Sequence, residues 1–310
     1  MLPKFILAPM DDVTDTVFRQ LIASLSPPDE FFTEFVNVDG LQSPGRPKLI
    51  NRLQFTDSEK PIVAQIWGLN PDNFYKTTQE IVKMGFSGVD INMGCPDKTV
   101  VKNGACSALI NDRELAEEII KATQKGAANK IPVSVKTRLG FNDVDLSWHE
   151  FLLKQNLDSL TIHGRTKKQM SKVPADWETI GKIRELRDKL SPSTKIIGNG
   201  DVLTKNQGLE LAKKYKLDGI MIGRGVFSDP YVFADKSPWE SLSKMDRVEL
   251  YKKHIELFRT TWKSNERPIK TLNKFCKIYI NGFVGAKELR EKLMNTTTLE
   301  DLIDKLNQIT

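Results

Sequence analysis

The sequence predicts an α/β fold, a (β/α)8 barrel of the TIM type followed by a small C-terminal all-helical domain. Eight short runs rich in β-branched and aromatic residues alternate with amphipathic segments over about 230 residues, which is the number and size of such a barrel. Polar residues and glycines gather directly after each run, where barrels of this kind carry their active sites. An open doubly wound sheet is the alternative, but no GxGxxG pattern follows the first run.

The strands and helices of the barrel are expected to alternate along the chain. The predicted strands are Phe5–Ala8, Phe31–Phe35, Ile62–Ile66, Gly88–Ile91, Val133–Lys136, Ser159–Ile162, Lys195–Ile197 and Gly219–Ile222. Apolar side chains at helical spacing, such as Leu115, Ile119 and Ala122, predict helices between them. The clearest of these helices are Pro71–Val82, Asp112–Gln124, Trp177–Leu190 and Lys205–Tyr215.

The strand pattern ends after Ser228-Asp229-Pro230, and the remaining sequence is helical in character. We expect a domain boundary there, with the barrel in residues 1–236 and a helical domain in residues 237–310. Pro268 suits the first turn of a helix, where a missing N–H costs no hydrogen bond. The helices expected in this domain are Lys244–Trp262, Pro268–Asn281, Ala286–Met294 and Thr298–Ile309.

Composition and charge narrow the class of protein. No apolar run reaches the roughly 20 residues that a membrane helix needs, and the first residues lack the apolar segment of a signal peptide. Cys95, Cys106 and Cys276 show neither CxxC nor Cys/His spacing, so we expect no disulfide framework, no metal site and a cytoplasmic location. The net charge is +6, and residues 237–310 hold 14 Lys and Arg against 10 Asp and Glu, which favours a polyanionic partner.

One cysteine stands in a turn. The stretch 89–96 reads Val-Asp-Ile-Asn-Met-Gly-Cys-Pro, a short strand that stops at Asn92 and leads to Cys95. Gly94 permits a close approach of the backbone to a ligand, and Pro96 stiffens the exit from the turn. A thiol at the rim of a sheet is a candidate for chemistry, and an inert buried cysteine is the alternative.

The turns after the last two strands suggest a phosphate site. Gly198 and Gly200 follow the seventh strand, and Gly223 and Gly225 follow the eighth. In barrels of this type these loops often bind phosphate through backbone N–H groups, and Arg224 adds a charge-assisted donor. Glycines that merely close tight turns would give the same pattern.

Three further side chains at strand ends suit a heterocyclic cofactor. Lys136 offers a cation to an anionic or electron-rich ring, and Gln65 can both donate to and accept from an amide edge. His163 ends a strand beside Arg165. Each of the three could instead be satisfied within the fold. Together with the phosphate site they predict bound flavin mononucleotide (FMN), with Cys95 facing the substrate across it.

Six segments of the chain match one known family in their order. They are Leu7-Ala8-Pro9-Met10, Asn92-Met93-Gly94-Cys95-Pro96, Val135-Lys136-Thr137-Arg138-Leu139-Gly140, His163-Gly164-Arg165-Thr166, Asn199-Gly200-Asp201 and Met221-Ile222-Gly223-Arg224-Gly225. The sequence thereby resembles the tRNA-dihydrouridine synthases over nearly its whole length. The resemblance implies an FMN-binding (β/α)8 barrel, a C-terminal helical domain that helps to hold tRNA, and NADPH as the reductant.

The resemblance also implies roles by position. Cys95 would be the catalytic proton donor to the uracil ring, and Arg138 and Arg165 are expected to contact RNA. Asp12 and Cys106 stand where the family usually has glycine. We expect the Asp12 turn to survive, because aspartate tolerates unusual backbone angles, and we expect Cys106 to be a bystander, with a second exposed thiol as the alternative. The implied cofactor contacts are Pro9, Met10, Asp11, Gln65, Asn92, Lys136, His163, Asn199, Gly200, Asp201, Gly223 and Arg224.

The functional hypothesis is reduction of the 5,6 double bond of a tRNA uridine by a monomeric enzyme. The uridine must leave its stack to reach the barrel, at a cost of a few kcal/mol. A free cysteine, with a pKa of about 8.5, is mostly protonated at neutral pH and can serve as the acid. Two alternatives remain: an FMN barrel oxidoreductase for a small molecule, similar to the dihydroorotate dehydrogenases, and a non-catalytic RNA-binding barrel.

A series of basic residues in the helical part is the candidate tRNA contact. Lys263, Arg267, Lys270, Lys274 and Lys277 recur at the spacing of one helix face. Since the helix is expected to begin at Pro268, its secure members are Lys270, Lys274 and Lys277. We expect these three lysines to bind tRNA phosphates, and an ordinary solvated helix face is the alternative.

Overall fold

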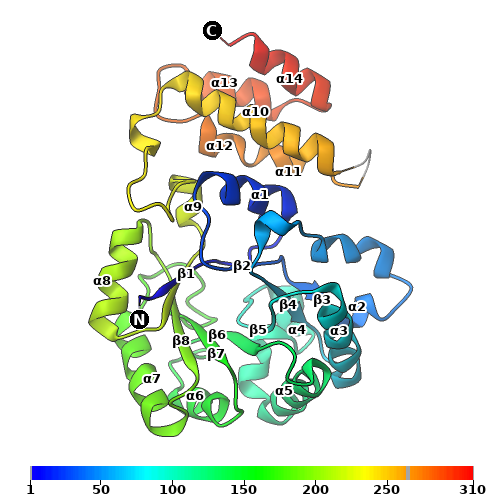
Figure 1. Cartoon of the computed structure of the whole chain (residues 1–310), viewed down its shortest axis with the longest axis vertical. Helices are drawn as coiled ribbons and strands as arrows, with labels where there is room; N and C mark the ends of the chain where they lie inside the picture. Colours follow the sequence, from blue (N-terminus) through cyan, green and yellow to red (C-terminus); the bar gives the residue numbers. More distant parts are fainter. Residues whose placement is uncertain (1, 263–265, 310) are drawn as a thin grey trace.

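The computed structural model describes residues 2–262 and 266–309, and within them a parallel sheet closes into a barrel surrounded by helices (Figure 1). All eight predicted strands are present, most of them extended by one or two residues at their carboxyl ends. The strands are β1 (Lys4–Leu7), β2 (Phe31–Phe32), β3 (Val36–Asn37), β4 (Ile62–Trp67), β5 (Gly88–Met93), β6 (Val133–Arg138), β7 (Ser159–His163), β8 (Lys195–Asn199) and β9 (Gly219–Ile222).

The strand order confirms a barrel rather than an open doubly wound sheet. Neighbouring strands are hydrogen-bonded in the order β1-β9-β8-β7-β6-β5-β4-β2. A parallel bridge between Ile6 and Glu30 joins β1 to the start of β2 and closes the ring. Only Phe31–Phe32 of the predicted strand Phe31–Phe35 forms a strand, β2; β3 follows just beyond the predicted range, and the two pair with opposite ends of β4. Glu34 lies between these two pieces, with its carboxylate turned to arginines.

Strand side chains alternate between two apolar layers, as the period of two requires. Those that point outward pack under the helices in the main core. A second cluster fills part of the barrel interior; its members are Ile6, Ala8, Phe32, Val63, Ile197 and Met221.

The barrel helices follow the predicted pattern. Asp112, Asp176 and Thr204 each accept a backbone N–H at a helix start, which satisfies one of the free donors there. Helices α7 and α8 have the predicted bounds. The helices of this part are α1 (Thr16–Leu25), α2 (Val38–Leu41), α3 (Pro71–Met84), α4 (Lys98–Lys102), α5 (Arg113–Ala127), α6 (Leu146–Leu153), α7 (Trp177–Leu190), α8 (Lys205–Tyr215) and α9 (Gly225–Ser228). Short 3₁₀ helices cover Arg46–Lys48, Ile50–Leu53, Asp57–Glu59, Cys106–Asn111 and Trp239–Ser241.

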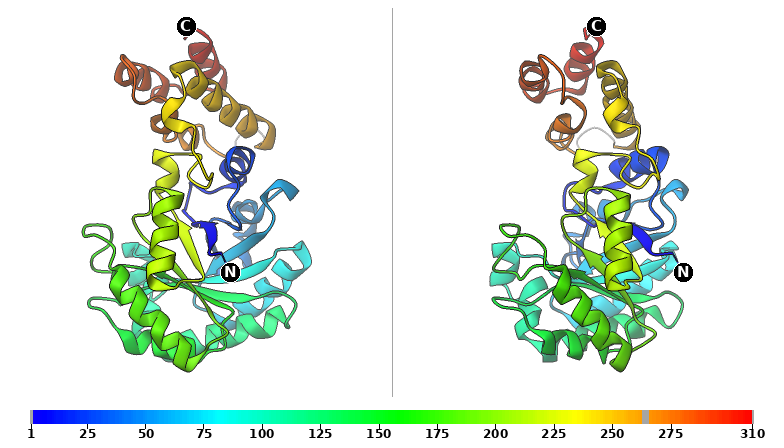
Figure 2. Two further views of the ribbon diagram at one scale, coloured as in Figure 1. Left: turned by 60° about the vertical axis from the view of Figure 1, so that its left-hand side comes forward. Right: turned by 90° about the vertical axis from the view of Figure 1, so that its left-hand side faces the viewer.

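A layer of helices stands beyond one end of the barrel, as Figures 1 and 2 show from three directions. It contains α10 (Lys244–Thr261), α11 (Lys270–Asn273), α12 (Cys276–Tyr279), α13 (Ala286–Met294) and α14 (Leu299–Asn307). The expected boundary at residues 236–237 falls in the connection that leads from α9 to this layer and stays a prediction. In the described part of the chain, no helix combines the length and the apolar character that crossing a membrane requires.

The prediction of one helix over Pro268–Asn281 is wrong, because this segment forms α11 and α12. The break coincides with a buried polar contact. The Asn273 side chain donates to the carbonyl oxygens of Met294, at 3.1 Å, and Thr296, at 3.4 Å. Phe275 then stacks on Phe18 of α1, with ring centroids 5.0 Å apart. Packing against the next helix and the barrel therefore overrides the helical period of the sequence.

Arg267 ties the helical layer to the barrel. Its side chain is 7% exposed and pairs with Glu34, whose side chain is fully buried. Arg267 also lies 3.5 Å from Asp12, and Arg52 reaches the same Glu34 carboxylate at 3.1 Å. The carboxylates of Asp11, Asp12 and Glu34 lie within 4.8 Å of one another, and these two arginines offset most of their negative charge. We call this group of five residues the rim ion cluster.

Candidate active site

The carboxyl ends of the strands enclose a cavity of about 540 Å³. The loop after β1, which contributes Pro9 and Met10 to it, also meets the helical layer, because Asp12 accepts from Lys274. Most of the predicted cofactor residues line it, namely Pro9, Met10, Lys136, His163, Asn199, Gly200, Asp201, Gly223 and Arg224. The structure therefore brings together side chains from five strand ends that are far apart in the sequence.

Asp11 is not part of this cavity. Its exposed carboxylate pairs with Arg52 in the rim ion cluster. The neighbouring Asp12 has a φ of +55°, so the turn survives with aspartate where glycine is usual, as expected. The turn after β1 thus contributes to two sites: Pro9 and Met10 line the cavity, and Asp11 and Asp12 belong to the rim ion cluster.

One end of the cavity has the features of a phosphate site. Gly200 has a φ of +136°, and a Cβ there would lie 2.6 Å from the Cβ of Ala175, so only glycine fits. The Asp201 carboxylate accepts from the backbone N–H of Ala175 at 2.9 Å and from Arg224 at 3.2 Å. This contact positions Arg224, whose side chain is 60% exposed, at the rim. Gly198 serves packing instead, because a Cβ there would lie 2.4 Å from the Trp177 ring.

Lys136 puts an uncompensated cation on the cavity wall. Across residues 2–262 and 266–309, its ammonium has neither a hydrogen-bond acceptor nor an ion-pair partner. Burial and then the charge of Arg138 lower the pKa of Lys136 to about 8. A partly buried ammonium without an anion is unfavourable unless a ligand supplies the negative charge. The wall therefore fits an anionic or electron-rich ring, which a flavin provides.

His163 is neutral at any physiological pH. Burial, followed by the charges of Lys136 and Arg138, lowers the pKa of His163 to about 2. Its Nε2 lies 3.1 Å from Nη1 of Arg165, and a guanidinium can only donate. Nε2 is therefore the acceptor, and Nδ1 carries the hydrogen.

Gln65 and Asn92 belong to a chain of hydrogen bonds that ends at Cys95. The Gln65 amide nitrogen donates to buried Asp90 at 2.7 Å, and its oxygen accepts from Asn92 at 3.0 Å. The Asn92 oxygen then accepts the backbone N–H groups of Gly94, at 3.0 Å, and Cys95, at 2.9 Å. The side chain of Asn92 thus fixes the turn that carries the thiol.

Asp90 was missed as a site residue. Burial raises its pKa to about 6, although Ser134 donates to it at 2.6 Å. The sequence does contain a signal, since a carboxylate stands between apolar Val89 and Ile91 in a strand that is buried on both faces.

Gly94 packs against a strand rather than leaving room for a ligand. A Cβ at Gly94 would lie 3.3 Å from the backbone of Lys136 and Thr137. The glycine therefore allows the turn of β5 to sit closely on β6, which places Cys95 beside the wall that carries Lys136.

Cys95 is more acidic than a free thiol. A hydrogen bond with the Cys106 thiol is the main reason that its pKa is lowered to about 7, with a smaller contribution from the charge of Arg138 and a partial offset from burial. The thiol is therefore less fully protonated at neutral pH than a free cysteine with a pKa of about 8.5 would be. Cys106 is buried rather than exposed, and its thiol is the largest influence on the pKa of Cys95; that it is a bystander stays a prediction.

Arg138 and Arg165 are built into the walls of the site. They are 5% and 2% exposed. Arg138 donates to the carbonyl oxygen of Gly94 at 2.7 Å and also holds the loop after β7 through Met170 at 3.1 Å. Arg165 pairs with Asp201. Both guanidinium groups already have partners in the fold, so this placement favours a role in shaping the site over direct contact with RNA.

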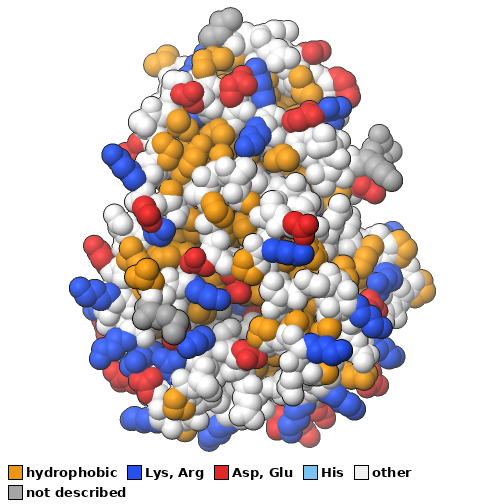
Figure 3. Space-filling view, in the orientation of Figure 1, with side chains coloured by type: hydrophobic (Ala, Val, Ile, Leu, Met, Phe, Trp, Pro, Cys, Tyr) orange, Lys and Arg blue, Asp and Glu red, His pale blue; other side chains and the backbone are white. Residues whose placement is uncertain are grey.

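Lys270, Lys274 and Lys277 are all exposed, although they lie on two short helices and the link between them. The Lys274 ammonium donates to the carbonyl oxygen of Asp12, so this segment borders the mouth of the barrel. Lys263 lies outside the described residues. On the face in Figure 3, basic side chains are interspersed with acidic ones rather than gathered in one patch.

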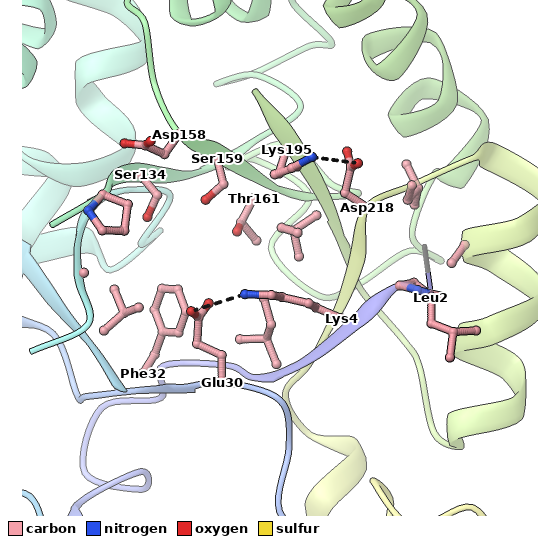
Figure 4. A pocket seen from close by; sticks show the side chains of 18 of the residues that line it. Leu2, Lys4, Glu30, Phe32, Ser134, Asp158, Ser159, Thr161, Lys195 and Asp218 are labelled. Carbon is pink, nitrogen blue, oxygen red and sulfur yellow. Dashed lines mark ion pairs between the residues drawn. The ribbon is translucent and has the colours of Figure 1, made fainter. Parts of the chain in front are cut away.

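A larger cavity of about 760 Å³ lies at the opposite end of the barrel (Figure 4). It is bordered by the amino ends of the strands, and the pairs Lys4–Glu30, at 3.9 Å, and Lys195–Asp218, at 4.0 Å, flank it. None of the predicted site residues lines it. In (β/α)8 barrels this end serves stability, whereas chemistry takes place at the carboxyl end.

Comparison with known proteins identifies close relatives over nearly the whole chain. Residues 6–310 match the family model described as dihydrouridine synthase (Dus). A probable tRNA-dihydrouridine synthase of Staphylococcus aureus (strain COL) is 46% identical over 302 residues, which cover 96% of this chain and 90% of that protein. The probable tRNA-dihydrouridine synthase 2 of Bacillus subtilis (strain 168) is 47% identical over 304 residues, which cover 97% of this chain and 92% of that protein.

Two solved structures show the same fold at low sequence identity. A morphinone reductase variant in complex with tetrahydroNAD has a TM-score of 0.51 at 10% identity, covering 77% of this chain and 89% of that one. Histamine dehydrogenase from Rhizobium sp. 4-9 has a TM-score of 0.56 at 12% identity, covering 82% of this chain and 49% of that one. These two structures share the fold of this chain and do not identify its family. The match over residues 6–310 and the two relatives do: the chain belongs to the dihydrouridine synthase family.

Proposed function

We propose that this protein reduces the 5,6 double bond of a uridine in tRNA to dihydrouridine, with FMN in the cavity at the strand ends and NADPH as the reductant. The observation that carries the proposal is the Lys136 ammonium, which has no ion-pair partner among the residues that the structure describes. Lys136 lies on β6 in register with Asn92 of β5, and Asn92 precedes Cys95 by three residues. A ring held by Lys136 would lie next to the thiol. The relatives in S. aureus and B. subtilis bear the same activity in their names.

The cavity residues divide into two groups by what they would hold. The backbone at Gly200 and Gly223, with Arg224 at the rim, would bind the FMN phosphate through N–H groups and a charge-assisted bond. Lys136 and neutral His163 would face the ring, where a cation stabilises negative charge. When bound and reduced by NADPH, FMN supplies a hydride to one carbon of the uracil double bond.

Cys95 would give the neighbouring carbon its proton. The Asn92 side chain fixes the backbone of Gly94 and Cys95, so the thiol has a defined position before the substrate arrives. The rim faces α11 and α12, so a uridine that swings out of tRNA into the cavity would pass beside the helical layer. Arg138 and Arg165 would keep the walls of this path in place.

Purified protein tests the function directly. We expect yellow protein with an FMN spectrum, NADPH oxidation that depends on added tRNA lacking dihydrouridine, and dihydrouridine in the product. Flavin reduction without a response to tRNA would favour the small-molecule oxidoreductase, and colourless protein that binds tRNA would favour the non-catalytic barrel. We also propose that the enzyme acts as a monomer in the cytoplasm. Light scattering checks the monomer.

The pKa of Cys95 predicts the pH dependence of the proton transfer. Only the protonated thiol can donate, so the rate should be constant below about pH 7 and fall about tenfold per unit above it. The charged neighbours that interact with this thiol are Asp97, Arg138 and Lys136, and the pKa of Lys136, lowered by burial to about 8, lies within that range. The measurement is the single-turnover reoxidation of reduced enzyme by tRNA between pH 6 and 9. A rate that rises through pH 8 would contradict the acid role.

Loss of Lys136 or Arg224 should weaken flavin binding. Lys136→Ala removes the cation beside the ring, and Arg224→Ala removes the side-chain donor to the phosphate. We expect each variant to show a lower ratio of flavin to protein absorbance after gel filtration than the parent. Lys130→Ala is the matched control, because Lys130 is exposed and precedes the opposite end of the same strand. Full flavin loading of both cavity variants would contradict these assignments.

Lys270 and Lys277 are the proposed phosphate contacts, whereas Lys274 already donates to Asp12. The double variant Lys270→Glu, Lys277→Glu should weaken tRNA binding and make its salt dependence shallower, by about 0.7–0.9 in the log–log slope for each phosphate that is no longer neutralised. Flavin content should not change. The control is Lys182→Glu, Lys189→Glu on α7, which makes the same charge change on exposed residues at the other end of the barrel. Equal salt slopes in the two double variants would show that Lys270 and Lys277 do not contact tRNA and lie on an ordinary solvated face.

A further inference from the structure

Two thiols from separate segments meet beside the cavity. Cys95 belongs to the turn after β5, and Cys106 begins the 3₁₀ helix Cys106–Asn111. The two thiols are close enough for each to shift the pKa of the other. The segments are also joined through the backbone, because Ser107 donates to the carbonyl oxygen of Cys95 from its hydroxyl at 2.8 Å and from its N–H at 3.4 Å. The thiols are therefore held near one another by contacts that do not involve sulfur.

The two thiols differ in ways that suit an ordered reaction. Cys95 is partly exposed, while Cys106 is fully buried. The pKa of Cys95 is lowered to about 7, and burial raises the pKa of Cys106 well above its ordinary value. An oxidant arriving from solvent would therefore meet the Cys95 thiolate first, since thiolate character and exposure determine the rate of attack.

The backbone of Cys106 indicates that local structure does not favour a side chain there. Its φ is +53°, in the left-handed region where glycine is preferred and other residues are strained. Glycine would relieve this strain, so the thiol is accommodated at a local cost. The side chain is fully buried and interacts with Cys95.

We propose that Cys95 and Cys106 form a reversible redox pair that switches the enzyme off under oxidising conditions. Hydrogen peroxide oxidises the Cys95 thiol to a sulfenic acid and is itself reduced to water. The Cys106 thiol then attacks that sulfur, the S–S bond forms, and the sulfenic oxygen leaves as a second water. The sulfurs must approach to about 2 Å, which is favoured because the bonds from Ser107 to the carbonyl oxygen of Cys95 hold the two segments together. A dithiol reductant restores both thiols by exchange.

The disulfide would remove the proton donor and so stop dihydrouridine formation; this consequence rests on the proposed function of Cys95, whereas bond formation does not. The Cys106 thiol also protects, because a sulfenic acid without a neighbouring thiol proceeds to the irreversible sulfinic acid. Cys276 is a built-in control, since it is buried in α12 of the helical layer, outside the two segments that carry Cys95 and Cys106.

The test treats the flavin-loaded enzyme with hydrogen peroxide, then with dithiothreitol. In the parent and in Cys276→Ala, we expect an intact mass lower by two hydrogen atoms, a tryptic peptide joining the two cysteines, and a loss of tRNA reduction that dithiothreitol reverses. In Cys106→Ser and Cys106→Gly, each compared with its own untreated rate, the loss should persist after dithiothreitol and Cys95 should carry two oxygens. The glycine variant also guards against a folding defect, because it relieves the φ of +53°.

The outcomes separate the two proposals. Absence of the linked peptide, or reversal by dithiothreitol in both Cys106 variants, would overturn the redox pair whatever the function of the enzyme. A linked peptide in protein that still reduces tRNA at the untreated rate would overturn the switch and, with it, the role of Cys95 as proton donor.

Discussion

Cys95→Ala should abolish most dihydrouridine formation while leaving a folded flavoprotein. Losing a positioned general acid typically costs about 10²–10⁴-fold in rate. The turn itself should survive, because Asn92 holds the backbone N–H groups of residues 94 and 95 and not the sulfur. Flavin content and reduction by NADPH should therefore match the parent. The measurements are single-turnover tRNA reduction, the flavin-to-protein ratio and stopped-flow reduction by NADPH.

The control for this variant is Cys276→Ala, which removes a buried thiol of the helical layer, far from the cavity residues in the sequence. We expect it to reduce tRNA at the parent rate. Rapid tRNA reduction by Cys95→Ala would show that another group donates the proton. Loss of flavin in Cys95→Ala would instead show that the thiol supports the cofactor site.

Arg267→Met should loosen the helical layer from the barrel. Arg267 and Glu34 are both nearly inaccessible to solvent, and removing one partner of such a pair leaves a buried charge at a cost of about 3–5 kcal/mol. Arg52 remains as a partial partner for Glu34, so the lower end of this range is expected. Hydrogen exchange in residues 286–307 should accelerate, and the urea midpoint should fall.

Two comparisons make this prediction specific. Arg259→Met, on α10, breaks the ion pair between Arg259 and Glu256. Both of these side chains are more than half exposed, so we expect no measurable change in hydrogen exchange or in the urea midpoint. The double variant Glu34→Gln, Arg267→Met should lose less than the sum of the single variants, because it leaves no unpaired charge at that contact. Strict additivity would mean that the pair is not coupled across the interface.

The barrel could be predicted from the sequence because its signals are local. Three elements have the predicted bounds: the strand Gly219–Ile222 and the helices Trp177–Leu190 and Lys205–Tyr215. Each shows one unbroken pattern of apolar residues between capping or turn residues. Strand ends in a parallel barrel meet at one rim, so most cavity residues could be named without knowledge of side-chain contacts. The helix over Pro268–Asn281 failed because Asn273 and Phe275 find their partners in other elements.

Which rim residues face a ligand could not be predicted, because their partners come from distant parts of the chain. Arg138 binds the carbonyl oxygens of Gly94 and Met170, and Asp11 is held by Arg52. Nothing near these residues in the sequence indicates such partners. Cys106 was interpreted as a bystander for the same reason, since its contact with Cys95 depends on how the segment between them folds back.

The pairing of Glu34 with Arg267 also has a consequence for synthesis. The two residues are 233 positions apart, so a ribosome adding 5–20 residues per second takes about 10–50 s to supply the second after the first. The last barrel strand ends at Ile222, 45 residues before Arg267, so for about 2–9 s of that time the sheet carries Glu34 with only Arg52 beside it, and Phe18 lacks the ring of Phe275. The end of the barrel where tRNA is proposed to enter is therefore completed last, and an unfinished chain exposes there an apolar surface of the kind that chaperones bind.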